Sequence, residues 1–222
     1  MRLRKIKNLD ARRDLCSDLR IPYELPSFDF RTDSTHESFI DFQNIFGRKA
    51  PLVMEIGCGK GQFVCEYAKR NPDKNIIAVE CVRGVLVEAC EKVKELGITN
   101  IRFLEMKAEY LPLFVEGKSI SELYLNFSTP YPKSKHESHR LTSELFLDIY
   151  KNLLCDDGFI AQKTDNKDFF EYSIESFKSN GFEVSNICRD LHSSDFKGNI
   201  VTEYEQRFVN MGMPIYRLEA RL

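Results

Sequence analysis

The sequence of 222 residues predicts an α/β protein with a mostly parallel sheet, and three observations lead to this fold class. Short apolar runs alternate along the chain with longer segments whose apolar residues recur at helical spacing. A glycine-rich turn connects the first apolar run to a helix, as at the ligand-binding edge of open α/β sheets. Hydrophobic residues make up 42% of the chain, which is enough to bury one substantial core. We therefore expect one folded domain, over residues 36–222.

The expected strands are the segments 52–56, 75–80, 101–106, 122–127, 159–163, 182–191 and 215–222. The last two are predicted to pair antiparallel at one edge, which gives a Rossmann-like, mostly parallel seven-stranded sheet with an antiparallel edge strand. Helices are expected at 62–70, 83–96, 143–154 and from about Lys167, with Thr142 as the cap of the third. The helix at 83–96 presents one apolar face, formed by Leu86, Ala89, Cys90, Val93 and Leu96.

Residues 1–35 are expected to form a basic, partly flexible arm. Its cationic residues are Arg2, Arg4, Lys5, Lys7, Arg12 and Arg13. The arm is either a disordered polar tail or a contact for nucleic-acid phosphates, and the two are compatible because such tails can fold on binding. The formal net charge of the chain is −2, so any nucleic-acid binding must depend on local basic patches.

The composition also limits the compartment and the metal chemistry. No apolar stretch approaches the length of a bilayer span and the first residues lead into no signal-peptide core, so we expect a cytoplasmic protein without membrane contact. The seven cysteines form no Cys-x-x-Cys pair, which favours reduced thiols over disulfides or zinc ligands. His136 and His139 are accompanied by no third ligand, so we expect no metal.

A glycine motif predicts a nucleoside site. The apolar run 52–56 is followed by Gly57, Gly59 and Gly61, which let the backbone turn tightly and approach a ligand closely. Glu80 ends the next expected strand about 20 residues later, where a carboxylate that binds ribose belongs.

The details of this motif favour S-adenosylmethionine as the nucleoside. Gln62 occupies the place of the third glycine of a dinucleotide motif, and no Ser or Thr follows Lys60, as a phosphate-binding P-loop requires. Glu55 places a carboxylate where a pyrophosphate would be repelled and a cationic ligand attracted. S-adenosylmethionine carries a sulfonium, an amino group and a ribose, and it has no phosphate.

A second segment predicts contact with a nucleobase. The expected strand 122–127 leads into Thr129-Pro130-Tyr131-Pro132-Lys133, where two prolines fix the backbone around one aromatic ring. Tyr131 is suited to stack on a base and Lys133 to hold a phosphate, supported by Lys135, His136, His139 and Arg140. The alternative is a proline-rich surface turn with solvated charges.

Together these residues resemble the bacterial tRNA (guanine-N7)-methyltransferase family. The matching stretches are 55–63, 124–128, 163–166, 169–173, 190–192, 198–205 and 214–217. The resemblance implies a Rossmann-like methyltransferase domain that transfers a methyl group from S-adenosylmethionine to N7 of a guanine in the tRNA variable loop. It leaves a monomer or a homodimer open.

The motifs and the resemblance together give the expected site residues. The cofactor residues are Glu55, Gly57, Gly59, Glu80, Lys107 and Asn126. The expected catalytic residue is Thr129, and the expected substrate-binding residues are Tyr131, Lys133, Asp165, Thr202 and Glu205. Two alternatives remain for the last group, because Asp165 could cap the helix that follows it and Thr202 with Glu205 has the spacing of a capping box.

Two of these residues depart from the family pattern. Thr129 stands where the family usually has the Asp of Asp-Pro-Trp-Pro, and Lys107 stands where an Asp usually holds the adenine. Guanine N7 already has a free lone pair, so methyl transfer needs placement more than a base. An Asp would also offset the charge that appears on the methylated ring, whereas Thr129 can only hydrogen-bond. We expect a slower enzyme; the alternatives are a tRNA-binding protein with weak or lost turnover, or a methyltransferase for another RNA or a small molecule.

Overall fold

The computed structural model describes residues 7–24 and 39–222, and its centre is a seven-stranded sheet in the order β3-β2-β1-β4-β5-β7-β6. The strands are β1 (Leu52–Ile56), β2 (Asn75–Val79), β3 (Ile101–Leu104), β4 (Ile120–Asn126), β5 (Leu154–Thr164), β6 (Glu183–Cys188) and β7 (Tyr216–Arg221). β1 to β5 are parallel, and β7 runs antiparallel to both β5 and β6. The predicted antiparallel pair at one edge is confirmed. Its inner strand, β7, is the one that runs opposite to the parallel strands.

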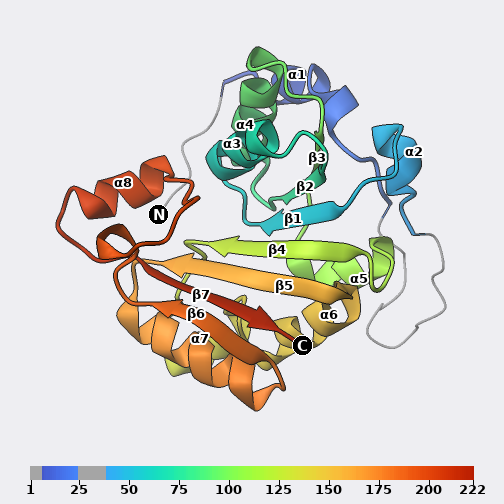
Figure 1. The fold of residues 1–222 in the computed structure, drawn as a ribbon. Coiled ribbons are helices and arrows are strands. Elements are labelled where there is room, and N and C mark those ends of the chain that lie inside the picture. The colour runs from blue at the N-terminus through green and yellow to red at the C-terminus, as the bar shows by residue number, and fades with distance from the viewer. Residues whose placement is uncertain (1–6, 25–38) are drawn as a thin grey trace.

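Helices cover both faces of the sheet. Alternate residues of a strand point to opposite faces, so each strand can pack apolar side chains against the helices on either side. On one face, Val53 and its neighbours pack under α3 (Gln62–Arg70) and α4 (Arg83–Glu95). On the other, Met54 and its neighbours pack against α5 (Leu111–Phe114), α6 (Glu144–Leu153) and α7 (Lys167–Ser179). The short helices α1 (Leu9–Asp14), α2 (Phe42–Phe46) and α8 (Glu203–Val209) lie outside these two layers (Figure 1).

Two local predictions were wrong. Thr142 does not cap α6, since Ser143 is the N-cap residue and Thr142 is fully buried with its hydroxyl 2.9 Å from that of Ser173 on α7. That buried bond joins α6 to α7. Leu96 is not part of the core; it lies just beyond the last turn of α4 and its side chain is 42% exposed. All seven cysteines are free, as predicted.

The described part of the expected arm packs against the domain. The amide of Ile21 donates to the carbonyl of Phe103 on β3 at 2.9 Å. Arg12 forms two hydrogen bonds with Glu91 on α4, and Arg13 pairs with Glu105 after β3. The guanidinium groups of Arg12 and Arg13 are therefore engaged by carboxylates. Arg2, Arg4, Lys5 and the expected domain boundary lie outside the described residues.

Within residues 7–24 and 39–222, no helix combines the length and the apolar character needed to cross a membrane. The same part of the chain contains no cluster of three or more residues suited to hold a metal ion.

Candidate functional site

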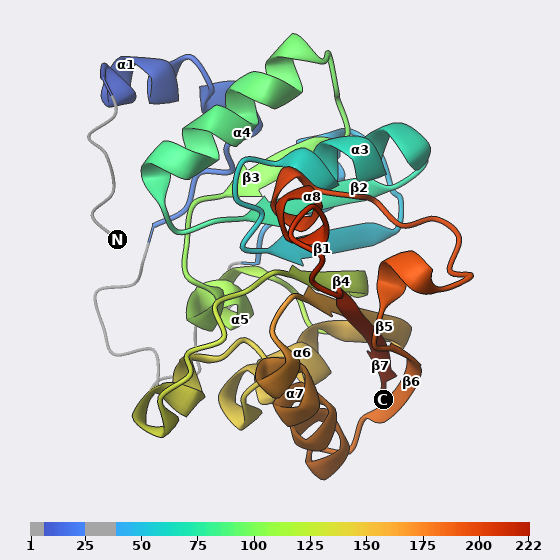
Figure 2. The same ribbon diagram turned by 90° about the vertical axis from the view of Figure 1, so that its left-hand side faces the viewer.

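A cavity of about 600 Å³ opens at the carboxyl ends of β1, β2, β3 and β4. Figure 2 looks onto this edge of the sheet, with α8 in front of it. Of the expected site residues, those that line the cavity are Gly57, Glu80, Lys107, Thr129 and Tyr131. The structure therefore brings the glycine motif and the proline-stiffened loop together in one cavity, at the place where parallel sheets bind ligands.

The glycine turn has the tight backbone conformation that the sequence predicts. Gly57, Gly59 and Gly61 have φ angles of 78°, 55° and 74°, in the region that favours glycine. A Cβ on Gly61 would lie 2.9 Å from the Cβ of Ala89, so this glycine lets α3 approach α4. A Cβ on Gly57 or Gly59 would meet nothing within 4 Å, so these two serve the backbone turn and leave the space above it open.

Glu80 is fixed at the wall of the cavity. One carboxylate oxygen accepts from the amide of Gly59 at 3.2 Å, and the other accepts from the amide of Val82 at 2.9 Å. Each carboxylate oxygen can accept a second hydrogen bond. Glu80 is thus held by the glycine turn in a position to accept from two ribose hydroxyls.

Glu55 lies on β1 below the glycine turn and is only 3% exposed. Its Oε1 accepts from Asn126 Nδ2 at 2.8 Å, whereas its Oε2 has no hydrogen-bond partner among the residues that the structure describes. Burial raises the pKa of Glu55 to about 8. A buried carboxyl with one free oxygen fits the cationic amino group of the expected cofactor, and Asn126 orients that carboxyl.

The loop after β4 holds Thr129 and Tyr131 at the cavity. Phe127 and Tyr131 have positive φ angles of 52° and 42°, which turn the chain sharply on either side of Thr129. Arg140 donates to the carbonyl oxygens of Pro130 at 3.0 Å and Tyr131 at 3.1 Å. Arg140 therefore stiffens the loop, a role that the sequence did not indicate.

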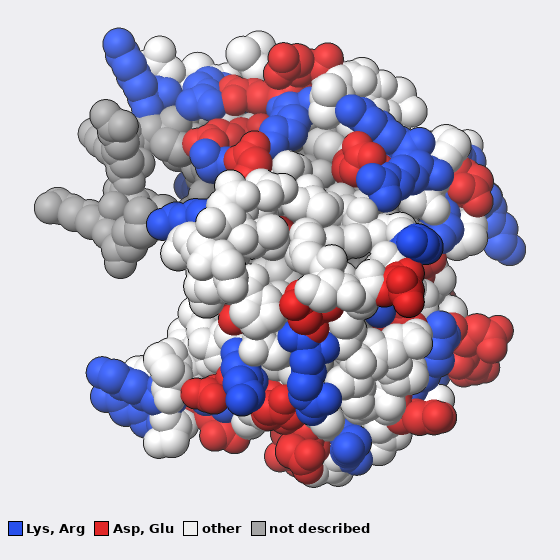
Figure 3. Space-filling model, turned by 60° about the vertical axis from the view of Figure 1, so that its left-hand side comes forward, with Lys and Arg blue, Asp and Glu red and all other residues white. Residues whose placement is uncertain are grey.

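The cationic residues of this loop differ in their partners. Lys133 and Lys135 are exposed and form no ion pair with the described residues, so both remain available to a phosphate. The ring of Tyr131 lies 5.7 Å from that of His139, which also lines the cavity. On the side of the molecule in Figure 3, basic and acidic side chains are interspersed around a band that carries few charges. No general nucleic-acid-binding surface is seen there, in agreement with the net charge.

Asp165 follows β5 and does not cap α7. The N-cap residue is Asn166, whose side chain accepts from the amide of Phe169 at 2.8 Å. Burial raises the pKa of Asp165, whose side chain is half-buried. The capping alternative for Asp165 was therefore wrong, and contact with substrate stays a prediction.

Thr202 and Glu205 hold α8 in place. The Thr202 hydroxyl accepts from the amide of Glu205 at 3.0 Å, which is one half of the expected capping box. The Glu205 side chain does not complete it; it is fully buried and accepts from Lys163 Nζ at 2.6 Å and Asn199 Nδ2 at 2.6 Å. His192 lies 2.8 Å from the same carboxylate. The structure does not bring Glu205 to the cavity, and its contact with substrate stays a prediction.

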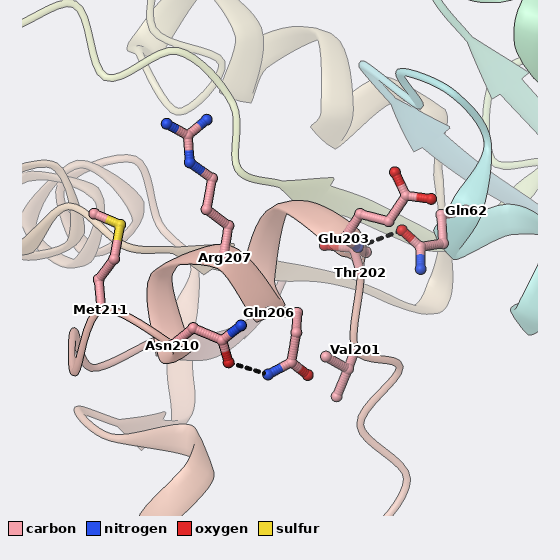
Figure 4. A pocket seen from close by; sticks show the side chains of 8 residues that line it. All are labelled: Gln62, Val201, Thr202, Glu203, Gln206, Arg207, Asn210 and Met211. Atoms are coloured by element: carbon pink, nitrogen blue, oxygen red, sulfur yellow. Dashed lines mark hydrogen bonds between the residues drawn. The ribbon is translucent and has the colours of Figure 1, made fainter.

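A second, shallow pocket of about 610 Å³ lies between the start of α3 and α8. Gln62 accepts there from the amide of Glu203, and Gln206 donates to Asn210 at 2.8 Å (Figure 4). Of the expected site residues, Thr202 alone lines this pocket. The glycine turn and Glu80, which are the expected cofactor residues, lie at the cavity at the strand ends and not at this pocket.

Known proteins resemble this chain in sequence and in fold. A family described as putative methyltransferase matches residues 49–218. A tRNA (guanine-N(7)-)-methyltransferase of Streptococcus pneumoniae (strain Hungary19A-6) is 46% identical over 184 residues, which cover 83% of this chain and 87% of that protein. The protein of that name in strain CGSP14 has the same identity and coverage.

Solved structures with low sequence identity share the fold. The 16S rRNA methyltransferase KamB has a TM-score of 0.63 at 15% identity and covers 82% of this chain and 94% of its own. A SAM-dependent methyltransferase from Aquifex aeolicus has a TM-score of 0.56 at 14% identity and covers 87% and 98%. The Rossmann-like fold is thereby confirmed. Since the sequence match extends over most of the chain, this protein belongs to the tRNA (guanine-N7)-methyltransferase family.

Proposed function

We propose that this protein transfers the methyl group of S-adenosylmethionine to N7 of a guanine in the variable loop of tRNA. One observation carries the proposal: a single cavity is lined both by the glycine turn with Glu80 and by the loop with Thr129 and Tyr131. A cofactor held at the glycine turn would present its methyl group to a base held at the loop after β4. We propose that the protein acts as a monomer or a homodimer.

The cofactor, when bound, supplies an electrophilic methyl group on a sulfonium. We assign its amino group to Glu55, its ribose to Glu80 and its adenine to the surroundings of Lys107. The N7 lone pair of the guanine would take up this methyl group while the carbon–sulfur electron pair stays on sulfur, so no proton would have to move. The protein contributes placement, and no general base is required.

The substrate residues act on placement as well. We propose that Tyr131 stacks on a base, Lys133 holds a phosphate, and Asp165 accepts hydrogen bonds from the edge of the guanine. Thr129 can hydrogen-bond the base but provides no anion to offset the charge on the product, so we propose that turnover is slow. Thr202 and Glu205 would act by holding α8 beside the site. tRNA as substrate implies action in the cytoplasm.

Two observations favour a second candidate, a tRNA-binding protein with weak or lost turnover. Thr129 and Lys107 both line the cavity, and neither has the carboxylate that the family pattern has at its position. Such a protein would bind tRNA and S-adenosylmethionine but transfer the methyl group very slowly.

Incubation with tRNA and isotope-labelled S-adenosylmethionine, followed by mass spectrometry of the nucleosides, separates these functions. If the proposed function is right, label appears in 7-methylguanosine. No label appears there when the substrate is a tRNA transcript in which adenine replaces the target guanine. Label in another nucleoside would indicate a different RNA methyltransferase. Tight tRNA binding without label over long incubation would establish the second candidate.

A further inference from the structure

An aromatic residue outside the cavity extends its wall. Tyr204 on α8 is 49% exposed, and its ring centroid lies 5.1 Å from that of Phe127. Phe127 itself lines the cavity. The ring of Tyr204 also packs on that of Phe208, with centroids 4.8 Å apart. The three rings thus form a continuous aromatic surface that leads from the cavity to solvent, and Tyr204 is its exposed part.

This surface is held firmly in position. Lys163 at the end of β5 donates to Glu205 on α8 at 2.6 Å, and its ammonium lies 5.7 Å from the centroid of the Phe127 ring. The Lys163–Glu205 pair is almost fully buried, which fixes α8 relative to β4 and β5. Tyr204 therefore keeps its place beside the cavity without a bound ligand, so little conformational entropy is lost when it binds one.

The half-exposed ring of Tyr204, beside the aromatic ring of Phe127 at the cavity, suits a flat aromatic occupant. Burial and the field of the Asp165 carboxylate raise the pKa of Tyr204. A protein partner would need a larger apolar area than one half-exposed ring supplies.

We propose that Tyr204 stacks on the purine that is methylated and that its π face stabilises the positive charge that the purine gains. This inference rests on the proposed function and names a contact for its substrate. The N7 lone pair forms the new bond and the carbon–sulfur electron pair stays on sulfur, so the positive charge moves from the sulfonium to the purine. An aromatic face attracts such a cation. Tyr204 thereby supplies part of the stabilisation that Thr129 cannot.

Two substitutions test the charge effect. Tyr204→Phe keeps an aromatic face, whereas Tyr204→Leu keeps apolar bulk and removes it. The quantity to compare is how much more tightly each protein binds an RNA hairpin that carries 7-methylguanosine than the unmethylated hairpin. We expect this preference to be about fivefold greater in the tyrosine and phenylalanine proteins than in the leucine variant. We also expect the single-turnover methylation rate to fall about fivefold or more in the leucine variant only.

Phe196→Leu is the matched control, because Phe196 is also a half-exposed ring but is covered by Arg217, 4.0 Å from its centroid. Equal preference for the methylated hairpin in the tyrosine and leucine proteins would overturn the proposal. So would a rate loss that Phe196→Leu reproduces. If the parent protein methylates no guanine, the proposed function fails, whereas the hairpin measurement still tests the stacking contact.

Discussion

The buried carboxyl of Glu55 provides the sharpest test of the cofactor site. Burial raises its pKa to about 8 in the folded protein, against an ordinary value of 4.5. Between these two pH values the folded state binds more protons than the unfolded state, so the free energy of unfolding falls as pH rises. At about 1.36 kcal/mol per pH unit, the full window from pH 4.5 to 8 corresponds to about 5 kcal/mol as an upper limit.

The substitution Glu55→Gln reproduces the neutral form at every pH. The glutamine keeps an oxygen that can accept a hydrogen bond from Asn126, and its side chain does not titrate. We expect the variant to gain stability relative to the parent as pH rises from 5 to 8.5, by about 2–4 kcal/mol after partial relaxation of the site. Urea denaturation at pH 5, 7 and 8.5 measures this difference. A difference that does not grow with pH would refute the desolvation argument.

The same residue should couple proton release to cofactor binding. A cationic amino group beside Glu55 favours the ionised carboxylate, so binding at pH 7 should release up to one proton from the site. Calorimetry in buffers with different ionisation enthalpies detects that proton. In Glu55→Gln we expect affinity to drop about tenfold or more and the buffer dependence from this group to vanish. A variant that binds S-adenosylmethionine as tightly as the parent would move the amino group elsewhere.

Three further outcomes are expected. Glu80→Ala should weaken S-adenosylmethionine binding by about 1.5–3 kcal/mol in calorimetry, and an unchanged affinity would place the ribose elsewhere. Replacing Lys133 and Lys135 by Ala should reduce the slope of log affinity for tRNA against log salt by roughly 0.7–0.9 per lost phosphate contact; an unaltered slope would leave these residues as solvated charges. Thr129→Asp should raise the single-turnover rate roughly tenfold, because about 1.4 kcal/mol suffices for that factor. If this variant binds tRNA equally well and is no faster, another acid offsets the charge.

The cofactor half of the site was predictable because its signals are local in sequence. Gly57, Gly59 and Glu80 each follow a strand that the apolar pattern reveals, and parallel strands bring their carboxyl ends to one edge. The free oxygen of Glu55 was not predictable, since it depends on burial and on Asn126, which is 71 residues away.

The substrate half was only partly predictable, because tertiary contacts decide it. Glu205 looks like a capping residue in the sequence, yet Lys163, 42 residues earlier, takes its carboxylate and holds α8 at the site. Arg12 and Arg13 look like free cations of an arm, yet carboxylates on the folded domain engage both. In each case a buried or long-range ion pair prevails over the local pattern.

The two halves of the cavity therefore differ in how they control charge. On the cofactor side, backbone amides fix Glu80 for the ribose hydroxyls, and burial would keep Glu55 protonated until a cationic group lies beside it. On the substrate side, Thr129 brings no charge, and the aromatic face of Tyr204 is the group placed to stabilise a cation there. A neutral, polarisable face stabilises the charge as it develops without attracting the unmethylated base as strongly. It follows that substitutions at Tyr204 and Thr129 should change the rate of methyl transfer more than the affinity for the cofactor.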